Sequence, residues 1–276
     1  MALGTGPAVT RARSRDGAEI GYWTSGEGPP VVLVHGMAAD HTTWDSLVPH
    51  LEPQVAVHAM DRRGRGASGD GAHYSLAREF EDLAAVVDAI ARAAGSPVDV
   101  LGHSFGGLCA FGGATLTKNI RRLVLYEGWP RVDPAAHAPS LQFMDLLETL
   151  LAAGEREALL TMFMREVAGI SEEELSMFQT SPVWRARVAA AHTIPREIRA
   201  EREATLESGQ AAKITAPTLL LIGGESTESL TADHNTVAEA LMEAQVTVLE
   251  GQGHAAHHLI PDVFAERVLV FLRTGR

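Results

Sequence analysis

Short apolar runs rich in β-branched residues alternate along this chain with longer segments of helical periodicity, and this alternation constrains the fold more than any other feature. Runs of this length are typical of strands buried on both faces. Strands of that kind, joined by helices, form a mostly parallel sheet flanked by helices. The predicted strands are 31–34, 55–60, 98–101, 123–126, 219–222 and 246–249, and helices are predicted at 76–94 and 261–272. We therefore predict an α/β fold.

Two segments depart from the alternation. Residues 9–14 and 19–23 alternate between apolar and polar side chains, which predicts an antiparallel hairpin at the sheet edge. Residues 130–212 show no convincing strand and instead carry amphipathic helical patterns rich in Leu, Met, Ala and Glu. We predict an inserted helical cap there, which leaves a core domain in two parts, 1–129 and 213–276.

Composition narrows the classes of partner. The chain has 35 Asp and Glu against 23 Lys and Arg, a net charge of −12 that would repel a phosphate backbone, so we expect no nucleic-acid partner. No stretch approaches the roughly 18 apolar residues of a membrane span, and the first residues lack the apolar run of a signal peptide. We expect a cytoplasmic protein with no membrane partner that binds a small-molecule substrate. The oligomeric state stays open, a homo-oligomer included.

The run DVLGHSFGG places Gly102, Ser104 and Gly106 directly after an apolar strand and before a helical segment. Glycines on either side of a serine permit a sharp strand-to-helix turn that holds the serine in strained backbone angles and exposes its hydroxyl. The alternative is a capping serine in a Gly-rich turn, but the strand-to-helix context favours catalysis. We predict Ser104 as a nucleophile and the backbone NH of Phe105 as an oxyanion donor.

A second oxyanion donor must come from another loop. The predicted strand in VVLVHG ends at His35 and Gly36, so the backbone NH of Met37 is our candidate. His35 could be a catalytic base, but a histidine at a buried strand end more often bonds backbone to hold a loop. His103, next to the serine, should point away from it and act as a spacer.

The general base is expected in GQGHAAHH, between the last strand and the last helix. A serine nucleophile needs a neutral imidazole to accept its proton, and His254 agrees with the chain order serine, acid, histidine. His257 and His258 are rivals that the spacing places on the following helical turns. No cysteine or paired carboxylate at ligand spacing accompanies these histidines, so we expect neither a metal nor a cofactor.

Taken together, the runs VVLVHG, DRRGRGASG, GHSFGG and GQGH resemble the α/β-hydrolase superfamily over nearly the whole chain. The resemblance implies the α/β-hydrolase fold. Members are commonly esterases, lactonases, thioesterases, haloperoxidase-like enzymes and carbon–carbon hydrolases. The related dehalogenases and epoxide hydrolases carry Asp at the nucleophile position, where this chain has Ser104.

The chain departs from the usual pattern of that superfamily at the acid, which is expected three residues after the Gly that ends the strand in APTLLLIGG. That position holds Ser226, whose hydroxyl cannot balance an imidazolium. Glu225 and Glu127 are the alternatives, and Asp233, which looks like a helix-start residue, is a third. We favour Glu127 because a strand end positions a carboxylate more rigidly than a loop. Some members with Ser at the later position also resemble this chain in carrying Glu at the earlier strand end.

Aromatic and Met side chains are frequent near the serine turn and in the predicted cap, where an apolar pocket could form over Ser104. We predict that four of them line it, although most such residues at helical spacing pack in a core. The four are Trp44, Trp129, Phe143 and Met144.

Three charged residues and the sole cysteine have simpler interpretations. Asp61, Arg62 and Arg63 lie in a Gly-rich turn and could bind an anion, but such residues usually fix the loop by hydrogen bonds. Cys109 cannot form an internal disulfide, and one helical turn after the serine it is expected to be a small buried residue.

The predicted function is that of a carboxylesterase-like serine hydrolase, which cleaves an ester-type bond (carboxylic ester, lactone or thioester) of a small apolar substrate through an acyl-enzyme. The alternative is a non-hydrolytic protein of the same fold, either a cofactor-free lyase or oxygenase or a small-molecule receptor. Retention of Ser104, His254 and a candidate acid favours catalysis.

Overall fold

A single mostly parallel sheet forms the centre of the protein. The structure is a computed structural model that describes residues 9–134, 138–205, 209–226 and 228–275. Within these residues the sheet has eight strands in the order β1-β2-β4-β3-β5-β6-β7-β8. The strands are β1 (Val9–Arg13), β2 (Glu19–Ser25), β3 (Pro30–Val34), β4 (Ala56–Met60), β5 (Val98–His103), β6 (Ile120–Tyr126), β7 (Thr218–Gly223) and β8 (Ala244–Leu249). Only the β1–β2 and β2–β4 pairs are antiparallel, which confirms both the α/β fold class and the hairpin at the sheet edge.

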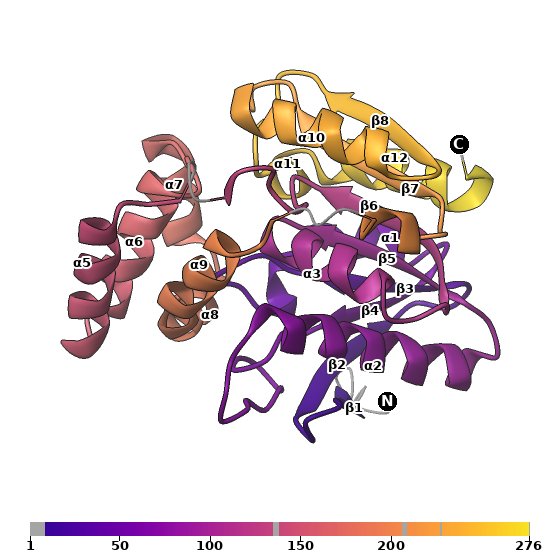
Figure 1. The fold of residues 1–276 in the computed structure, drawn as a ribbon, viewed down its shortest axis with the longest axis horizontal. Coiled ribbons are helices and arrows are strands. Elements are labelled where there is room, and N and C mark those ends of the chain that lie inside the picture. Colours follow the sequence, from indigo (N-terminus) through magenta and orange to yellow (C-terminus); the bar gives the residue numbers. More distant parts are fainter. Residues whose placement is uncertain (1–8, 135–137, 206–208, 227, 276) are drawn as a thin grey trace, which may run out of the picture.

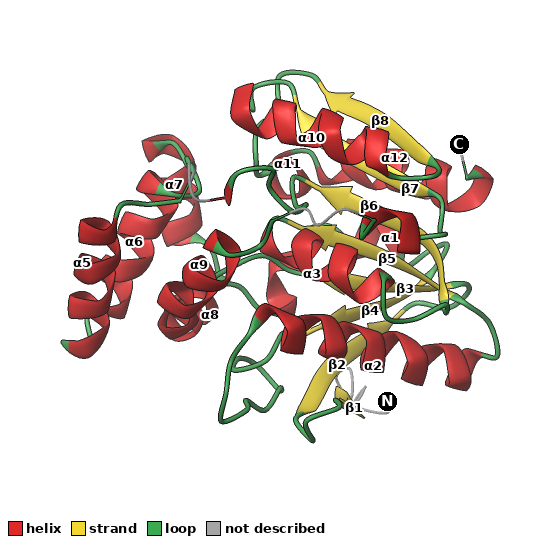
Figure 2. Cartoon of the chain, viewed as in Figure 1, coloured by secondary structure: helices red, strands yellow, loops and turns green. Residues whose placement is uncertain are grey.

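Helices cover both faces of the sheet (Figure 1, Figure 2). One face carries α2 (Leu76–Ala94), α3 (Phe105–Ala114) and α10 (Glu228–Ala240), and the other carries α1 (Val48–Leu51) and α12 (Pro261–Thr274). Strand β3 shows why its sequence is continuously apolar: Val32 and Val34 belong to one hydrophobic cluster, whereas Val31 and Leu33 belong to the other. Burial on both faces leaves no position for a polar side chain.

Local signals set the bounds of α2, which agree with those predicted. Ser75 caps the helix, since its hydroxyl accepts a hydrogen bond from the Arg78 backbone NH at 3.4 Å. Gly95 ends it at a φ of 67°, in the left-handed region that glycine adopts at little cost. A helix with such end signals is readable from sequence because its caps do not depend on distant residues.

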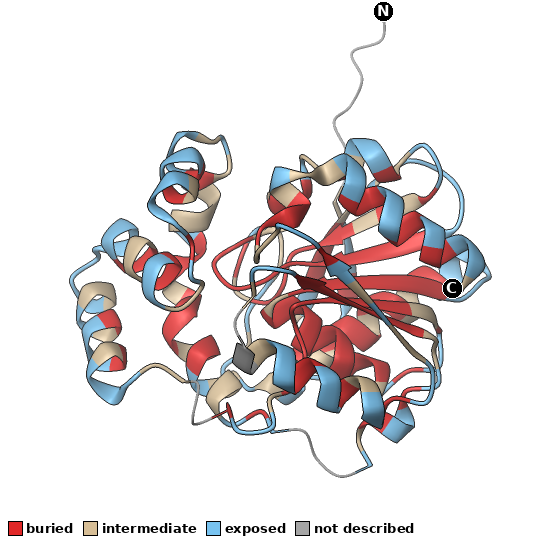
Figure 3. Ribbon diagram, turned by 90° about the horizontal axis from the view of Figure 1, so that it is seen from above, coloured by how far each residue is buried: buried red, intermediate tan, exposed pale blue. Residues whose placement is uncertain are grey.

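The segment between β6 and β7 is helical. It contains α5 (Leu141–Ala152), α6 (Arg156–Glu166), α7 (Glu172–Thr180), α8 (Trp184–Ala190) and α9 (Ile194–Arg202), with short 3₁₀ turns at Ala191–Thr193 and Ala211–Lys213. Figure 3 shows these helices to one side of the sheet. No sheet strand occurs in the described part of this segment, where a lone bridge pairs Arg131 with Thr205. The division into domains at 130 and 212 stays a prediction.

The described helices differ from the long, apolar helices that span membranes. None of them combines the length and the apolar character that crossing a bilayer requires.

Candidate active site

Ser104 lies on a strained turn between β5 and α3. Its φ and ψ are 54° and −130°, a backbone conformation that residues other than glycine rarely adopt. The turn is held on both sides, because the Ser104 NH donates to the Tyr126 carbonyl at 2.9 Å and the Ser104 carbonyl accepts from the Gly107 NH at 2.8 Å. A Cβ on Gly106 would lie 2.2 Å from the Val34 carbonyl oxygen, so glycine is required for this close approach.

The structure brings His254 and Glu127 together. The His254 Nδ1 lies 2.7 Å from the Glu127 Oε2, and the second carboxylate oxygen accepts hydrogen bonds from the Gly223 NH at 2.8 Å and from the Ser226 hydroxyl. Burial alone would raise the pKa of Glu127, whose side chain is 1% exposed, but these hydrogen bonds outweigh it and lower that pKa. An ionised Glu127 fixes the hydrogen of His254 on Nδ1 and leaves Nε2 free to accept a proton.

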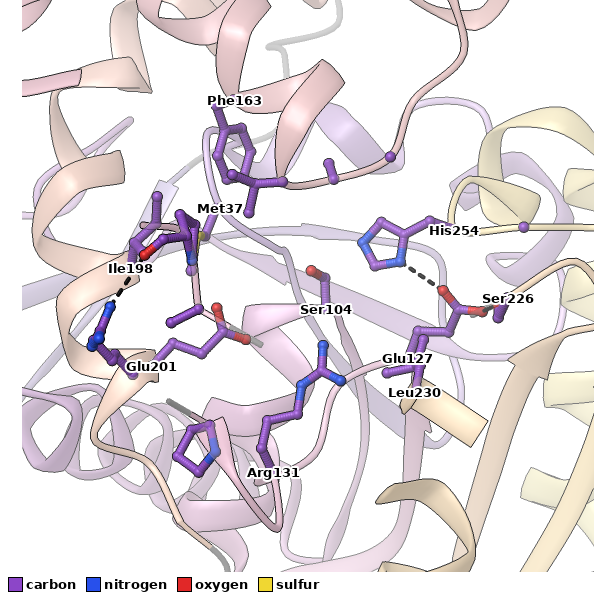
Figure 4. Close-up of a pocket in the computed structure, with 18 of the residues that line it drawn as sticks. Met37, Ser104, Glu127, Arg131, Phe163, Ile198, Glu201, Ser226, Leu230 and His254 are labelled. Carbon is purple, nitrogen blue, oxygen red and sulfur yellow. Dashed lines mark hydrogen bonds and ion pairs between the residues drawn. The ribbon is translucent and has the colours of Figure 1, made fainter. Parts of the chain in front are cut away.

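Ser104 and His254 face the same pocket, into which Figure 4 shows both side chains pointing. The structure does not join the Ser104 hydroxyl to the His254 ring by a hydrogen bond. In ligand-free enzymes this contact is often long and tightens only around a substrate. The arrangement therefore supplies a hydroxyl, an imidazole and a carboxylate in the order that nucleophilic catalysis requires.

Two residues that the sequence did not single out for this role hold the His254 loop. The Tyr126 hydroxyl donates to the Gly253 carbonyl and accepts from the Ala256 NH at 3.1 Å. The His103 Nε2 lies 2.9 Å from the His254 carbonyl oxygen, so His103 points away from Ser104, as expected of a spacer, and contacts the loop of the base.

The loop after β3 lies against Ser104. A Cβ on Gly36 would come within 3.1 Å of the Ser104 Cβ and 3.5 Å of its hydroxyl. His35 holds this loop, as predicted, because its Nδ1 bonds the Gly36 carbonyl at 2.8 Å and its Nε2 accepts from the Arg62 NH at 3.1 Å. Burial lowers the pKa of His35 well below its ordinary value, which keeps its imidazole neutral.

The predicted oxyanion donors flank the serine. Phe105 is the first residue of α3, and Met37 follows Gly36 in the β3 loop. In the described part of the chain, neither backbone NH donates to a protein acceptor. Both donors are therefore available to a ligand, in contrast to the NH of Ser104.

The charged turn after β4 is structural. Arg62 pairs with Glu79 at 2.7 Å and Arg63 pairs with Asp82 at 2.6 Å, all with fully buried side chains. Asp61 accepts hydrogen bonds from neighbouring backbone NH groups at 2.8 Å. The described residues that line the pocket at Ser104 do not include Asp61, Arg62 or Arg63. The loop-fixing interpretation of the turn therefore fits the structure better than anion binding.

The main pocket, which we define as the cavity of about 280 Å³ beside Ser104 and His254, differs from the apolar cavity that the sequence suggested. Its walls come from the β3 loop, α6, α9 and the start of α10. They combine apolar and charged side chains, among them Met37, Phe163, Ile198, Arg131 and Glu201 (Figure 4). A substrate here would meet polar groups as well as apolar ones.

The prediction that four aromatic or Met residues line the pocket was wrong. Neither cavity at Ser104 has any of them among its described lining residues. Trp44 is fully buried and packs against the rings of His103 and His257, and Trp129 packs against His234. Met144 belongs to the larger hydrophobic cluster of the protein, and the half-buried Phe143 packs against that cluster. Helical periodicity shows which face of a helix is apolar, but not whether that face meets another helix or a ligand.

Two other acid candidates make no hydrogen bond to the base in the described structure, although Glu225 lines the main pocket with His254. Asp233 lies within α10 rather than at its start, and it accepts hydrogen bonds from Arg131 at 3.2 Å and from the Val132 NH at 3.0 Å. Glu225 is exposed, and in the described structure its side chain makes no hydrogen bond to His254. Glu127 is thus the carboxylate that contacts the His254 ring.

Glu201 was missed by sequence reasoning. It lies on α9 and lines the main pocket, into which it points together with Arg131 (Figure 4). Burial raises the pKa of Glu201, and the charge of Arg131 opposes that rise. No motif accompanies Glu201, so only the packing of α9 against the pocket reveals it.

Comparisons with known proteins show the family of the chain. The profile of the alpha/beta hydrolase family matches residues 31–267. The chain is 26% identical over 266 residues to a putative carbamate hydrolase, RutD, of Azorhizobium caulinodans, covering 92% of this chain and 95% of that protein. It is 27% identical over 265 residues to pyrrolizixenacetamide deacetylase of Xenorhabdus hominickii, again covering 92% and 95%.

A solved structure extends the likeness to the fold. The crystal structure of an alpha/beta hydrolase from Sphaerobacter thermophilus matches with a TM-score of 0.80 at 33% identity, covering 95% of this chain and 100% of that one. The family profile and the hydrolase names of the relatives support a general hydrolase role. The chain belongs to the alpha/beta hydrolase family.

Proposed function

We propose that this protein is a carboxylesterase-like serine hydrolase that cleaves an ester-type bond of a small substrate through an acyl-enzyme. The observation that carries the proposal is the 2.7 Å contact between His254 Nδ1 and Glu127 Oε2, next to a serine held at a φ of 54°. Serine, imidazole and buried carboxylate in that order are the components of a nucleophilic triad.

In the proposed mechanism the Ser104 oxygen attacks the substrate carbonyl while its proton passes to His254 Nε2. The backbone NH groups of Met37 and Phe105 stabilise the oxyanion, and Glu127 balances the imidazolium. His254 then returns the proton to the departing alcohol. A water molecule, deprotonated by His254, attacks the acyl-enzyme and releases the acid, which restores the Ser104 hydroxyl.

The relatives support acyl chemistry rather than one particular bond. Their names refer to a carbamate and to an acetamide, and both would be cleaved at an acyl carbon through a tetrahedral oxyanion. Esters share this intermediate and carry a better leaving group than amides. Activated esters are therefore the first substrates to test.

The test is covalent labelling with a fluorophosphonate followed by intact-protein mass measurement. Wild-type protein should gain one adduct, because only an activated serine reacts. Ser104→Ala should gain none, whereas the matched control Ser176→Ala, at an exposed serine of α7, should label like wild type.

Turnover of p-nitrophenyl acetate tests the same assignment kinetically. Ser104→Ala and His254→Ala should each lower kcat by at least about 10⁴-fold with the circular dichroism spectrum unchanged, because the two groups act as one unit. Wild-type-like hydrolysis by either variant would refute the assignment. Labelling without turnover of any ester would instead favour the non-hydrolytic alternative.

A further inference from the structure

A second cavity adjoins Ser104. This side pocket has a volume of about 50 Å³ and shares Met37, Ser104 and His254 with the main pocket. Phe163, Met164 and other apolar side chains form much of its wall. Its charged and polar groups come from elsewhere: Thr43 from the 3₁₀ turn His41–Trp44, Arg187 from α8, and His257 and His258 from α11 (Ala256–Leu259). The described lining includes no acidic residue.

Arg187 forms no ion pair with a described residue of this pocket, although the charge of Asp40, outside the pocket lining, acts on it. Its Nη2 donates to the Thr43 hydroxyl at 2.9 Å and to the His258 Nε2 at 3.1 Å, and its guanidinium lies 5.1 Å from the centre of the Phe178 ring. Its Nε is buried and has no acceptor, and no carboxylate of the described residues forms an ion pair with it. Burial lowers the pKa of Arg187 to about 10, so the group is still cationic at neutral pH.

Three other arginines in or near the site are paired with carboxylates, whereas the half-buried Arg202 of the main pocket bonds the Pro139 carbonyl. Arg62 and Arg63 pair with Glu79 and Asp82, and Arg131 in the main pocket pairs with Asp233 at 3.2 Å. A cation removed from water without a partner charge is costly, and proteins usually pair it. The described structure pairs these three arginines with carboxylates, whereas it bonds the half-buried Arg187 only to neutral groups.

The two histidines beside Arg187 are neutral, and His257 can supply one N–H donor, whereas the Nε2 of His258 accepts from Arg187. Burial, and then the charge of Arg187, lowers the pKa of His258 to about 3, and burial lowers the pKa of His257 well below its ordinary value. Both ring nitrogens of His257 are buried without a hydrogen-bond partner in the described structure. The side pocket therefore combines one positive charge with unsatisfied polar atoms, a combination that suits a compact anion.

We propose that Arg187 binds a carboxylate at the far end of the acyl part of the substrate, so that preferred substrates are monoesters of short dicarboxylic acids. The inference rests on the proposed function, since it assigns an acyl group to Ser104. The alcohol leaves before water attacks the acyl-enzyme, so it suits the larger main pocket, whereas the side pocket has room for a few atoms only. A guanidinium is well matched to a carboxylate because its planar donors can bond both oxygens.

A pair of isosteric esters tests the charge in isolation. Monomethyl succinate carries a carboxylate where methyl 4-oxopentanoate carries a methyl ketone, and methanol release measures both. Wild-type kcat/KM should be about tenfold to a hundredfold higher for monomethyl succinate, mainly through KM, as expected for a hydrogen-bonded charge. Equal values, or a preference for the ketone, would overturn the inference.

Variants of α8 connect the preference with Arg187. Arg187→Met should abolish most of the preference for monomethyl succinate over its neutral isostere, and Arg187→Lys should retain part of it. Arg185→Met removes an exposed arginine of the same helix and should leave both rates at wild-type values. If Arg187→Met fails to fold, the wild-type comparison and the lysine variant still decide.

Two further measurements distinguish a failure of this inference from a failure of the proposed function. Acetoxyacetate and acetoxyacetone place the same charge difference in the alcohol part, and a preference for acetoxyacetate would overturn the acyl assignment. Calorimetric binding of monomethyl succinate to Ser104→Ala needs no turnover, and it should weaken about tenfold or more when Arg187→Met is added. Undiminished binding in the double variant refutes the carboxylate site, whereas absence of fluorophosphonate labelling refutes the proposed function.

Discussion

At the scale of single residues, the hydrogen bonds of the Glu127 carboxylate explain most about the arrangement of the site. Glu127 follows β6 at a φ of 46°, and its two oxygens are occupied by His254, the Gly223 NH and the Ser226 hydroxyl. Ser226, at the position where the superfamily usually has its acid, thus donates a hydrogen bond to the carboxylate that reaches His254 from another strand end. The Ser226 hydroxyl therefore holds the Glu127 carboxylate in place and does not contact His254 itself.

The two glutamates provide a matched pair of substitutions. Glu127→Gln should lower kcat for p-nitrophenyl acetate by roughly 10³- to 10⁴-fold, because an amide neither fixes the imidazole hydrogen nor balances its positive charge. Glu225→Gln, at an exposed loop position, should change the rate only slightly. Steady-state kinetics of both variants at pH 7 is the measurement. The reverse order of damage would transfer the acid role to Glu225 and leave Ser104 and His254 in theirs.

At the scale of elements, the turn after β4 joins three parts of the protein. Arg62 bonds the Gly36 carbonyl of the β3 loop at 3.1 Å, pairs with Glu79 of α2, and lies 3.2 Å from Glu197 of α9. Arg65 also pairs with Glu197, whose side chain is fully buried. This ion network connects the last helix of the inserted segment with the loop that lies against the serine.

Removing the Glu197 carboxylate from α9 should therefore lower the free energy of unfolding. Glu197→Ala should lower the free energy of unfolding by about 3–5 kcal/mol, because it leaves buried guanidinium groups with incomplete compensation. Glu203→Ala, at the exposed end of the same helix, should change it by less than about 0.5 kcal/mol. Urea unfolding followed by circular dichroism measures both. If the two variants lose equal stability, the network does not stabilise the fold.

At the scale of the whole molecule, the helical segment and the sheet together enclose the serine. Residues from α6 and α9 line the main pocket, and residues from α7 and α8 line the side pocket, while the sheet supplies Ser104 and Glu127 at its strand ends. Figure 3 shows these helices as a layer beside the sheet. Cavities of about 280 and 50 Å³ are small compared with an extended lipid chain.

Substrate length should follow from these volumes. The kcat/KM for p-nitrophenyl acetate or butyrate should exceed that for the palmitate ester by at least about tenfold, because neither cavity at Ser104 has room for an extended long chain. A series of p-nitrophenyl esters of increasing acyl length measures this. Efficient hydrolysis of emulsified triglycerides would contradict the prediction.

Local patterns determined much of the fold and pointed to the candidate nucleophile. Strands such as β3 and β7 could be predicted because burial on both faces requires continuous apolar runs, and α2 because Ser75 and Gly95 mark its ends. The position of Ser104 also follows from local geometry, since glycines two residues away on each side permit its turn. These features depend on residues a few positions apart, so the sequence alone determines them.

The tertiary structure decided the rest. The contact of Glu127 with His254 joins residues 127 positions apart, so the sequence could only favour Glu127 over Glu225, and the packing of the loops after β6 and β8 brings Glu127 to the His254 ring. The pocket lining was predicted wrongly for Trp44, Trp129, Phe143 and Met144 because an apolar helix face looks the same whether it meets a core or a ligand. Arg187 is notable only once its neighbours are known, since the absence of an ion pair is a property of the packed structure and not of the residue.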